Sequence, residues 1–515
     1  MPIKTIIKPS EYHDSVSLML VAQELAKSPG VTDAAVVMGT EANKHILKEA
    51  GLLTAEADAA SPNDLVIAVS ADEHSLSDAL ATAEKLLQAK QSVGESAEFR
   101  PKSLRSATKA NPDANVAVIS VAGRYAAAEA REALQRGLHV LLFSDNVSLA
   151  DEIALKQYAS QHGLLLMGPG AGTALLNGVA LGFANVIPAG PVGIVSAAGT
   201  GLQEVSTLLA KRGVGITQGI GTGGRDLNKD VGGIMMLAGL EALQDDPETQ
   251  VIILVSKPPA AEVADAVMRQ VLQSDKPTVV CLLGGKLRDE LSGGATRVYP
   301  ASTLEEAALL AANLANPGSQ QGAAQPEGVG ASELRKRLKS DQRYLRGLFS
   351  GGTLCYEAQV IWRNLLAEPV FSNAPLEKGQ QLADSTRSLR HSAVDLGEEE
   401  FTVGRLHPMI DNDLRIRRLL QEAQDPEVAV IMLDVVIGYG AHPDPASELV
   451  TAVRKGHHAA VAAGRDLLFV ASVTGTELDP QRLSRQVTTL QEAGVVVCAS
   501  NAAAARLVAG VVGAG

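Results

Sequence analysis

Short runs of valine, isoleucine and leucine alternate with longer segments of helical periodicity along most of the chain. Helical patterns cover residues 15–26 and 126–135, for example. Because strands that alternate with helices usually pair in parallel, the pattern predicts a mostly parallel, Rossmann-like α/β domain for residues 1–187. Six runs in this part are expected to be strands: residues 3–7, 34–37, 65–69, 116–121, 140–143 and 164–167.

The same alternation continues in two further segments. Residues 188–316 carry apolar runs near 193–195, 215–218, 251–255 and 278–283, and residues 343–515 carry a comparable series. The intervening residues 317–342 begin with a stretch rich in proline, glycine, glutamine, serine and alanine, which is typical of a linker. The predicted fold is α/β with three parallel-sheet layers, in which two duplicated flavodoxin-like domains follow the Rossmann-like domain.

A repeat supports the duplication. The passage Ala198-Gly-Thr-Gly-Leu-Gln-Glu204 returns as Gly351-Gly-Thr-Leu-Cys-Tyr-Glu357, and the triplet Asp-Pro-Glu occurs at residues 246–248 and again at 425–427. Internal self-similarity of this kind indicates two units of one design that differ in their loops.

Each copy places a serine-bearing, glycine-rich turn between an apolar run and a helical pattern. The backbone N–H groups and the dipole at the start of a helix attract anions, so the two turns predict a phosphate or carboxylate site shared by two helices. The alternative is a pair of tight corners in which glycine permits positive φ and threonine caps a helix. The candidate phosphate-binding residues are Ser196, Gly199, Thr200 and Gly201 in the first turn, and Ser350, Gly351, Gly352 and Thr353 in the second.

A second glycine cluster contains Gly223, Gly224 and Arg225, and residues 401–405 are its counterpart in the third segment. An arginine after glycine in both copies suggests bidentate binding of the same anion, although a surface ion pair explains it equally well. His407 and His442 lie in polar loops and are candidate catalytic groups. Cys355 follows the second turn, where it is either a nucleophile or, more simply, a small buried residue.

Composition and charge exclude several classes of function. The 515 residues have a formal net charge of −13, which argues against nucleic acid and anionic membranes as partners. The three cysteines show neither metal nor disulfide spacing, and no apolar run is long enough for a membrane span. We therefore expect a cytoplasmic protein without a metal site.

The residues also resemble a known superfamily. Residues 190–290, with Gly193 to Thr200 and Gly219 to Gly224, look like the second domain of the succinyl-CoA synthetase α subunit. The third segment resembles the C-terminal domain of the β subunit. The whole chain is similar to the FdrA family of the acyl-CoA synthetase superfamily, in the passages 167–169, 221–227, 348–355 and 407–411. The resemblance implies CoA as a possible cofactor.

The departures from that superfamily are specific. Residues 291–296 lack the histidine that the synthetases phosphorylate, and Lys257 stands where they carry an acidic residue. No segment resembles their ATP-grasp domain. The CoA loop is also missing, because residues 10–15 contain no glycine and Gly170-Ala171 replaces Asn-Cys.

These losses leave three hypotheses. The chain transfers an acyl or carbamoyl group from an acyl or carbamoyl phosphate that two helix ends bind, with Lys257 as a further candidate catalytic residue and CoA as the acceptor. Alternatively, it is one subunit of a carbamoyltransferase of the oxamate type, completed by partner enzyme subunits. The third hypothesis is a non-catalytic anion-binding or scaffold subunit. In each case we expect an oligomer.

Overall fold

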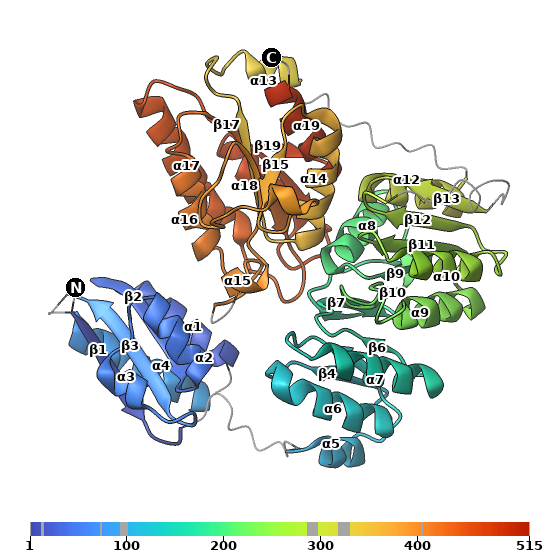
Figure 1. Ribbon diagram of the computed structural model, residues 1–515, viewed down its shortest axis with the longest axis horizontal. Helices are drawn as coiled ribbons and strands as arrows, with labels where there is room; N and C mark the ends of the chain where they lie inside the picture. Colours follow the sequence, from blue (N-terminus) through green and yellow to red (C-terminus); the bar gives the residue numbers. More distant parts are fainter. Residues whose placement is uncertain are drawn as a thin grey trace. The chain divides into compact units, whose positions relative to one another are not determined.

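The computed structural model describes residues 2–11, 15–72, 75–92, 101–285, 297–317, 330–402 and 405–513. The chain divides into two compact units (Figure 1). One consists of residues 1–102 together with 399–407, and the other of residues 103–398 together with 408–515. We describe each unit by itself.

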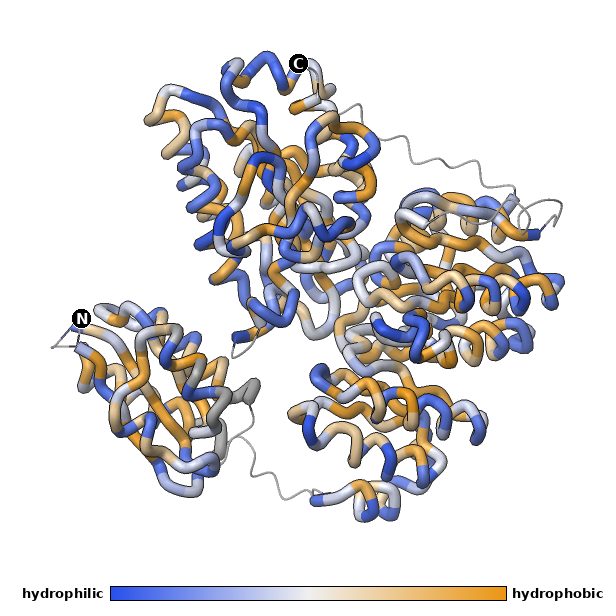
Figure 2. The backbone as a smooth tube through the Cα atoms, in the orientation of Figure 1, coloured by the Kyte–Doolittle hydropathy of each residue, from blue (hydrophilic) through white to orange (hydrophobic). Residues whose placement is uncertain are grey.

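The N-terminal unit is built on a three-stranded antiparallel sheet in the order β1-β3-β2. Strand β3 is almost wholly buried, and Figure 2 shows it as a hydrophobic segment in the middle of the unit. Its elements are β1 (Ile3–Lys8), α1 (Ser15–Ala26), β2 (Val31–Met38), α2 (Glu41–Glu49), α3 (Ala55–Ala59), β3 (Leu65–Ala71), α4 (Leu76–Ser92) and α15 (Glu399–Thr402).

The expectation of one parallel sheet over residues 1–187 is therefore wrong for the first three strands. The central β3 runs antiparallel to both neighbours, with Ile3 opposite Ser70 and Val36 opposite Ile67. An apolar run of five or six residues looks the same in either kind of sheet, so hydrophobic alternation could not reveal the direction of pairing.

The larger unit begins with a small parallel sheet, in the order β4-β5-β6. Its elements are α5 (Leu104–Ala110), β4 (Val116–Ile119), α6 (Gly123–Gln135), β5 (His139–Leu142), α7 (Leu149–Gln161) and β6 (Leu166–Met167). This is the part of residues 1–187 that has the predicted parallel arrangement.

A seven-stranded sheet follows, in the order β13-β12-β11-β9-β10-β7-β8, and is parallel apart from the hairpin at its β7-β8 edge. Because this hairpin lies before residue 187, the second domain begins earlier than expected. Helices α8 and α12 cover one face, and α9 and α10 the other (Figure 1). The elements are β7 (Thr173–Leu176), β8 (Val179–Gly182), β9 (Ala189–Ser196), α8 (Gly199–Lys211), β10 (Ile216–Gly221), α9 (Ile234–Asp245), β11 (Val251–Ser256), α10 (Ala261–Val271), β12 (Thr278–Leu282), β13 (Val298–Ala301) and α12 (Leu304–Ala315).

The C-terminal domain is a six-stranded parallel sheet, in the order β15-β16-β14-β17-β18-β19. Helices α14 and α19 pack on one face, and α16, α17 and α18 on the other. Its elements are β14 (Tyr344–Phe349), α14 (Gly352–Leu365), β15 (Val370–Ser372), the 3-10 helix η1 (Lys378–Gln380), β16 (His391–Asp395), α16 (Asp413–Glu422), β17 (Val428–Val436), α17 (Pro445–Ala462), β18 (Leu468–Thr474), α18 (Leu483–Glu492), β19 (Val496–Cys498) and α19 (Asn501–Gly513).

One hydrophobic core joins the last two domains. It contains Leu209 and Ala308 from the first of them and Leu354 and Val508 from the second. Part of the predicted linker also belongs to this core, because helix α13 (Ala331–Arg335) packs against α19 and buries Leu334. Linker residues 318–329 lie outside the described part of the chain. The α/β class with several parallel sheets is confirmed.

Candidate functional site

The two repeated turns meet in the structure. Each ends a central strand, β9 or β14, and begins a helix, α8 or α14. The backbone N–H of Thr353 donates to the hydroxyl of Thr200 at 3.3 Å. A Cβ atom added to Gly351 would lie 2.8 Å from the Thr200 methyl group, so glycine at this position allows the two turns to approach. The expectation that two helix N-termini lie together therefore agrees with the geometry.

The start of α14 already holds a carboxylate of the chain itself. Asp434 accepts hydrogen bonds from the backbone N–H groups of Ser350 and Gly351, both at 2.8 Å, and from the Ser350 hydroxyl at 3.1 Å. Arg415 pairs with Asp434 at 2.9 Å, and both side chains are buried. Ser350 and Gly351 thus bind an internal anion, so the two turns are not equivalent as phosphate-binding sites.

A second carboxylate, that of Asp395, lies beside the same helix end. It is the last residue of β16, and a Cβ added to Gly352 would lie 2.5 Å from its Oδ2 atom. Burial raises the pKa of Asp395 from 3.8 to about 7; the charge of Glu398 raises it further, while Lys257 lowers it. Asp395 can therefore exchange a proton near neutral pH.

Sequence reasoning missed both carboxylates. Asp434 interrupts the otherwise apolar strand β17, and Asp395 is the last residue of β16. A charged residue inside or at the carboxyl end of a buried parallel strand was the available signal, because ligand sites of α/β sheets lie along that edge.

The start of α8 has a different environment. The Ser196 hydroxyl bonds within its own turn, donating to the Ala198 carbonyl and accepting from the Ala198 N–H. Within the described part of the chain, the N–H groups of Gly199, Thr200 and Gly201 have no hydrogen-bond acceptor. These are the unpaired donors of a first helical turn, so α8 retains the capacity to bind an anion.

Lys257 supplies positive charge next to these helix ends. It directly follows β11, is exposed, and its ammonium group lies 5.3 Å from the centre of the Tyr356 ring. Its charge acts on Asp395 and Cys355, because it lowers the pKa of both groups. Lys257 is thus the predicted catalytic candidate whose position agrees best with the two helix ends.

The glycine cluster with Gly223, Gly224 and Arg225 has another role. Gly223 adopts φ +88° against the carbonyl of Pro169. Arg225 lies 2.8 Å from the buried Glu152 on α7 and donates to the Val147 carbonyl. Arg225 therefore links the seven-stranded sheet to the small parallel domain, which agrees with ion pairing rather than anion binding. Two residues of its predicted counterpart, 403 and 404, lie outside the described residues.

The other candidate catalytic residues form interactions within the fold, are buried in the core, or belong to the other compact unit. His442 Nδ1 accepts from the Asp444 N–H at 3.0 Å, and its Nε2 lies 3.3 Å from Glu448. His407 belongs to the N-terminal compact unit. Cys355 is fully buried, and burial raises the pKa of its thiol, which agrees with a small core residue and not with a nucleophile. Residues 291–296, where the phosphorylated histidine is missing, lie outside the described residues.

Three family matches cover much of the chain. Residues 1–102 match the heavy metal-associated domain of AllF, residues 189–283 a CoA binding domain, and residues 348–511 the CoA-ligase family. The N-terminal match does not bring a cysteine metal site, because residues 1–102 contain no cysteine. Among the residues that the structure describes, no group of three or more His, Cys, Asp or Glu side chains could hold a metal ion. Nor does any described helix have the length and apolarity needed to span a membrane.

Comparison with single proteins agrees with these matches. The chain is 44% identical over 508 residues to the protein YahF of Escherichia coli K12, covering 97% of each. It is 28% identical over 148 residues to the succinate–CoA ligase α subunit of Methanothermobacter thermautotrophicus, and spans 49% of that relative's length. A solved acetyl-coenzyme A synthetase of Ca. Korarchaeum cryptofilum aligns over 78% of this chain and 82% of its own, at 15% identity and a TM-score of 0.32. Its CoA-binding and CoA-ligase domains relate the chain to the succinate–CoA ligases. The chain belongs to the family of YahF and has an FdrA-like architecture.

Proposed function

We propose that the chain binds the phosphate of an acyl or carbamoyl phosphate at the start of α8 and transfers the acyl or carbamoyl group to an acceptor. The observation that carries the proposal is the first turn of α8 next to α14, where the N–H groups of Gly199, Thr200 and Gly201 have no acceptor among the described residues. Donors fixed in this way stabilise charge on a departing phosphate without reorganising.

Two side chains would assist. Lys257 provides a positive charge on the same side of the sheet, and Asp395 has a pKa close to neutrality. Asp395 in its ionised form would accept the proton of an attacking acceptor, and the acceptor would then displace phosphate from the acyl carbon. The products of this reaction are the acylated or carbamoylated acceptor and inorganic phosphate.

CoA stays a candidate acceptor because of the CoA-binding and CoA-ligase matches. The loop after β6 offers little to hold it: Ala171 is buried, and Gly170 packs against the Asp145 carboxylate. The alternative is an acceptor that binds together with partner subunits of a carbamoyltransferase.

A non-catalytic anion-binding role is the second candidate. Asp434 already occupies the start of α14, so a chain that only senses an anion would need no more than the free turn of α8. In this role a bound anion would stabilise the fold without being consumed.

The test is phosphate release from carbamoyl phosphate or acetyl phosphate, by the purified full chain alone and with partner subunits, with and without CoA. Turnover only with CoA supports acyl-CoA formation, and turnover with an amide or ureido acid supports carbamoyl transfer. If no combination turns over while phosphate raises the melting temperature, the binding role is supported.

A double variant connects the activity to the two turns. Thr200→Val with Thr353→Val removes both threonine hydroxyls, including the one that accepts the Thr353 N–H. We expect at least a hundredfold loss of turnover or of phosphate affinity. Thr489→Val on α18, a half-buried threonine whose hydroxyl donates to the Arg485 carbonyl of its own helix, is the matched control. Full activity of the double variant would refute a shared role of the two turns.

A further inference from the structure

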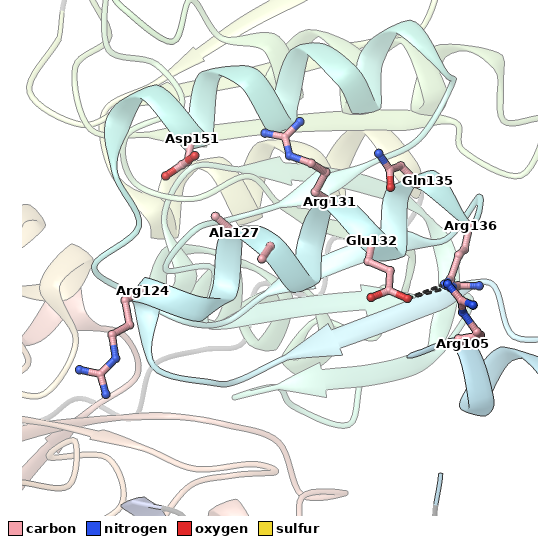
Figure 3. A pocket seen from close by; sticks show the side chains of 9 residues that line it. Arg105, Arg124, Ala127, Arg131, Glu132, Gln135, Arg136 and Asp151 are labelled. Atoms are coloured by element: carbon pink, nitrogen blue, oxygen red, sulfur yellow. Dashed lines mark hydrogen bonds and ion pairs between the residues drawn. The ribbon is translucent and has the colours of Figure 1, made fainter. Parts of the chain in front are cut away.

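An arginine-rich hollow lies on the small parallel domain, apart from the two repeated turns (Figure 3). Its volume is about 610 Å³. One face of α6 forms the floor, with the small residues Ala127 and Ala128, and α5 and the start of α7 form the sides. The charged residues around it are Arg105, Arg124, Arg131, Arg136, Glu132 and Asp151.

Positive charge exceeds negative charge in this hollow. Glu132 is already bound by Arg136, at 2.7 Å, and Asp151 accepts the hydroxyl of Ser148 at the start of α7. Arg105 and Arg131 have no acidic partner among the residues that the structure describes. In a chain with a net charge of −13, an unneutralised arginine cluster around a cavity needs a different explanation from general solubility.

The arginines around the hollow come from α5 and from α6 with the residue that follows it. Arg105 on α5 and Arg136 after α6 both line the hollow, while Arg131 reaches toward α7 (Figure 3). Arg131 and Arg136 are five residues apart on the helical surface, a rise of about 7.5 Å. The positive charges around the hollow repel one another, and a bound anion would reduce that repulsion.

We propose that this hollow binds a small molecule carrying two or more phosphate groups, at a site separate from α8 and α14. Arg105 and Arg136 bind one phosphate group and Arg131 binds another, because the planar guanidinium donates two parallel hydrogen bonds to a phosphate. The apolar floor at Ala127 and Ala128 leaves room for the organic part of a phosphate ester. The shared chemistry is that of inorganic polyphosphates and nucleotides.

Calorimetric titration of the full chain with tripolyphosphate, ATP and adenosine tests the proposal. We expect tripolyphosphate and ATP to bind, with an affinity that falls as salt rises, and adenosine not to bind. Arg105→Gln with Arg131→Gln should weaken both at least tenfold. Arg454→Gln, an exposed arginine on α17 outside the hollow, is the matched control and should have no effect.

Three outcomes would overturn the proposal: no binding of tripolyphosphate at physiological salt, equal affinity in the double variant and the wild type, or binding of hexaglutamate more tightly than of tripolyphosphate. The last would indicate an acidic protein partner. Circular dichroism of the double variant checks that the substitutions leave the fold intact. If the fold is disturbed, the single variant Arg131→Lys, which keeps the charge but loses the paired donors, decides the question by the same tenfold criterion.

Discussion

Glu204 and Glu357 hold equivalent positions in the two repeats, and each accepts the first backbone N–H of the last helix in the other domain. Glu204 accepts from Asn501 at the start of α19 at 2.9 Å, and Glu357 accepts from Leu304 at the start of α12 at 2.7 Å. Both carboxylates are buried. Because a carboxylate at a helix N-terminus satisfies free donors and opposes the dipole, the two domains cap each other reciprocally.

This arrangement predicts a pH-dependent stability. Burial raises the pKa of Glu357 from 4.5 to about 7, so between these values the folded chain holds one more proton than the unfolded chain. The free energy of unfolding should therefore fall as pH rises from about 4.5 to 7, by roughly 3 kcal/mol from this group. Glu357→Gln should remove that part of the slope in urea unfolding measured across pH 5 to 8. The control, Glu333→Gln at an exposed ion pair, should retain it.

Arg415 and Asp434 form a buried ion pair. We expect that replacing the arginine alone strongly destabilises the protein, and that replacing the aspartate as well restores part of the stability. Arg415→Met leaves the Asp434 carboxylate without its cation, which should cost about 3–5 kcal/mol in unfolding experiments. Adding Asp434→Asn removes the buried charge and should recover part of the loss, since the amide oxygen still accepts from Ser350. A double variant less stable than Arg415→Met would contradict this account.

Asp395 predicts that anion binding at the neighbouring helix end depends on pH. Its pKa is about 7, so above neutrality its negative charge should repel an anion at α8. Sulfate is a suitable probe because its own charge is constant over this range. The sulfate affinity, measured from the rise in melting temperature, should be about tenfold higher at pH 6 than at pH 8. Asp395→Asn should abolish the difference, and Asp384→Asn at an exposed site should leave it unchanged.

The thiols should be unreactive in the folded protein. Burial raises the pKa of Cys281 and Cys355, and raises that of Cys498 to about 11. Native protein at pH 7.5 should therefore react slowly with a disulfide reagent, and all three thiols should react after denaturation. Rapid labelling of Cys355, identified by mass spectrometry, would restore the nucleophile hypothesis.

The hydrophobic periodicity predicts which residues form strands and helices better than it predicts how the strands pair. In the seven-stranded sheet, β9, β10, β11 and β12 lie close to the four expected runs, because strand and helix alternate regularly there. The β1-β3-β2 sheet is antiparallel and not parallel as expected. The direction of pairing depends on the connections between strands, which the apolar runs do not encode. Helix α13 was likewise hidden within a polar segment, where a single buried Leu334 attaches it to the core.

Part of the candidate site could be predicted from the sequence. The repeat indicated that Thr200 and Thr353 lie at related helix ends, and the structure brings them into contact. The functional difference between the ends depends on Asp395 and Asp434, which reach α14 from strands far away in the sequence. Arg225 could not be assigned from its neighbours either, because its partner Glu152 belongs to another domain.

The reciprocal capping by Glu204 and Glu357 has a consequence for the covalent connection between the two domains. Their shared core and crossed hydrogen bonds join described residues on both sides of positions 318–329 in the sequence. A chain cleaved within residues 318–329 should therefore stay associated as a two-fragment complex, with a melting temperature that depends on concentration. The two duplicated domains therefore resemble the two subunits of a heterodimer, joined by one peptide connection.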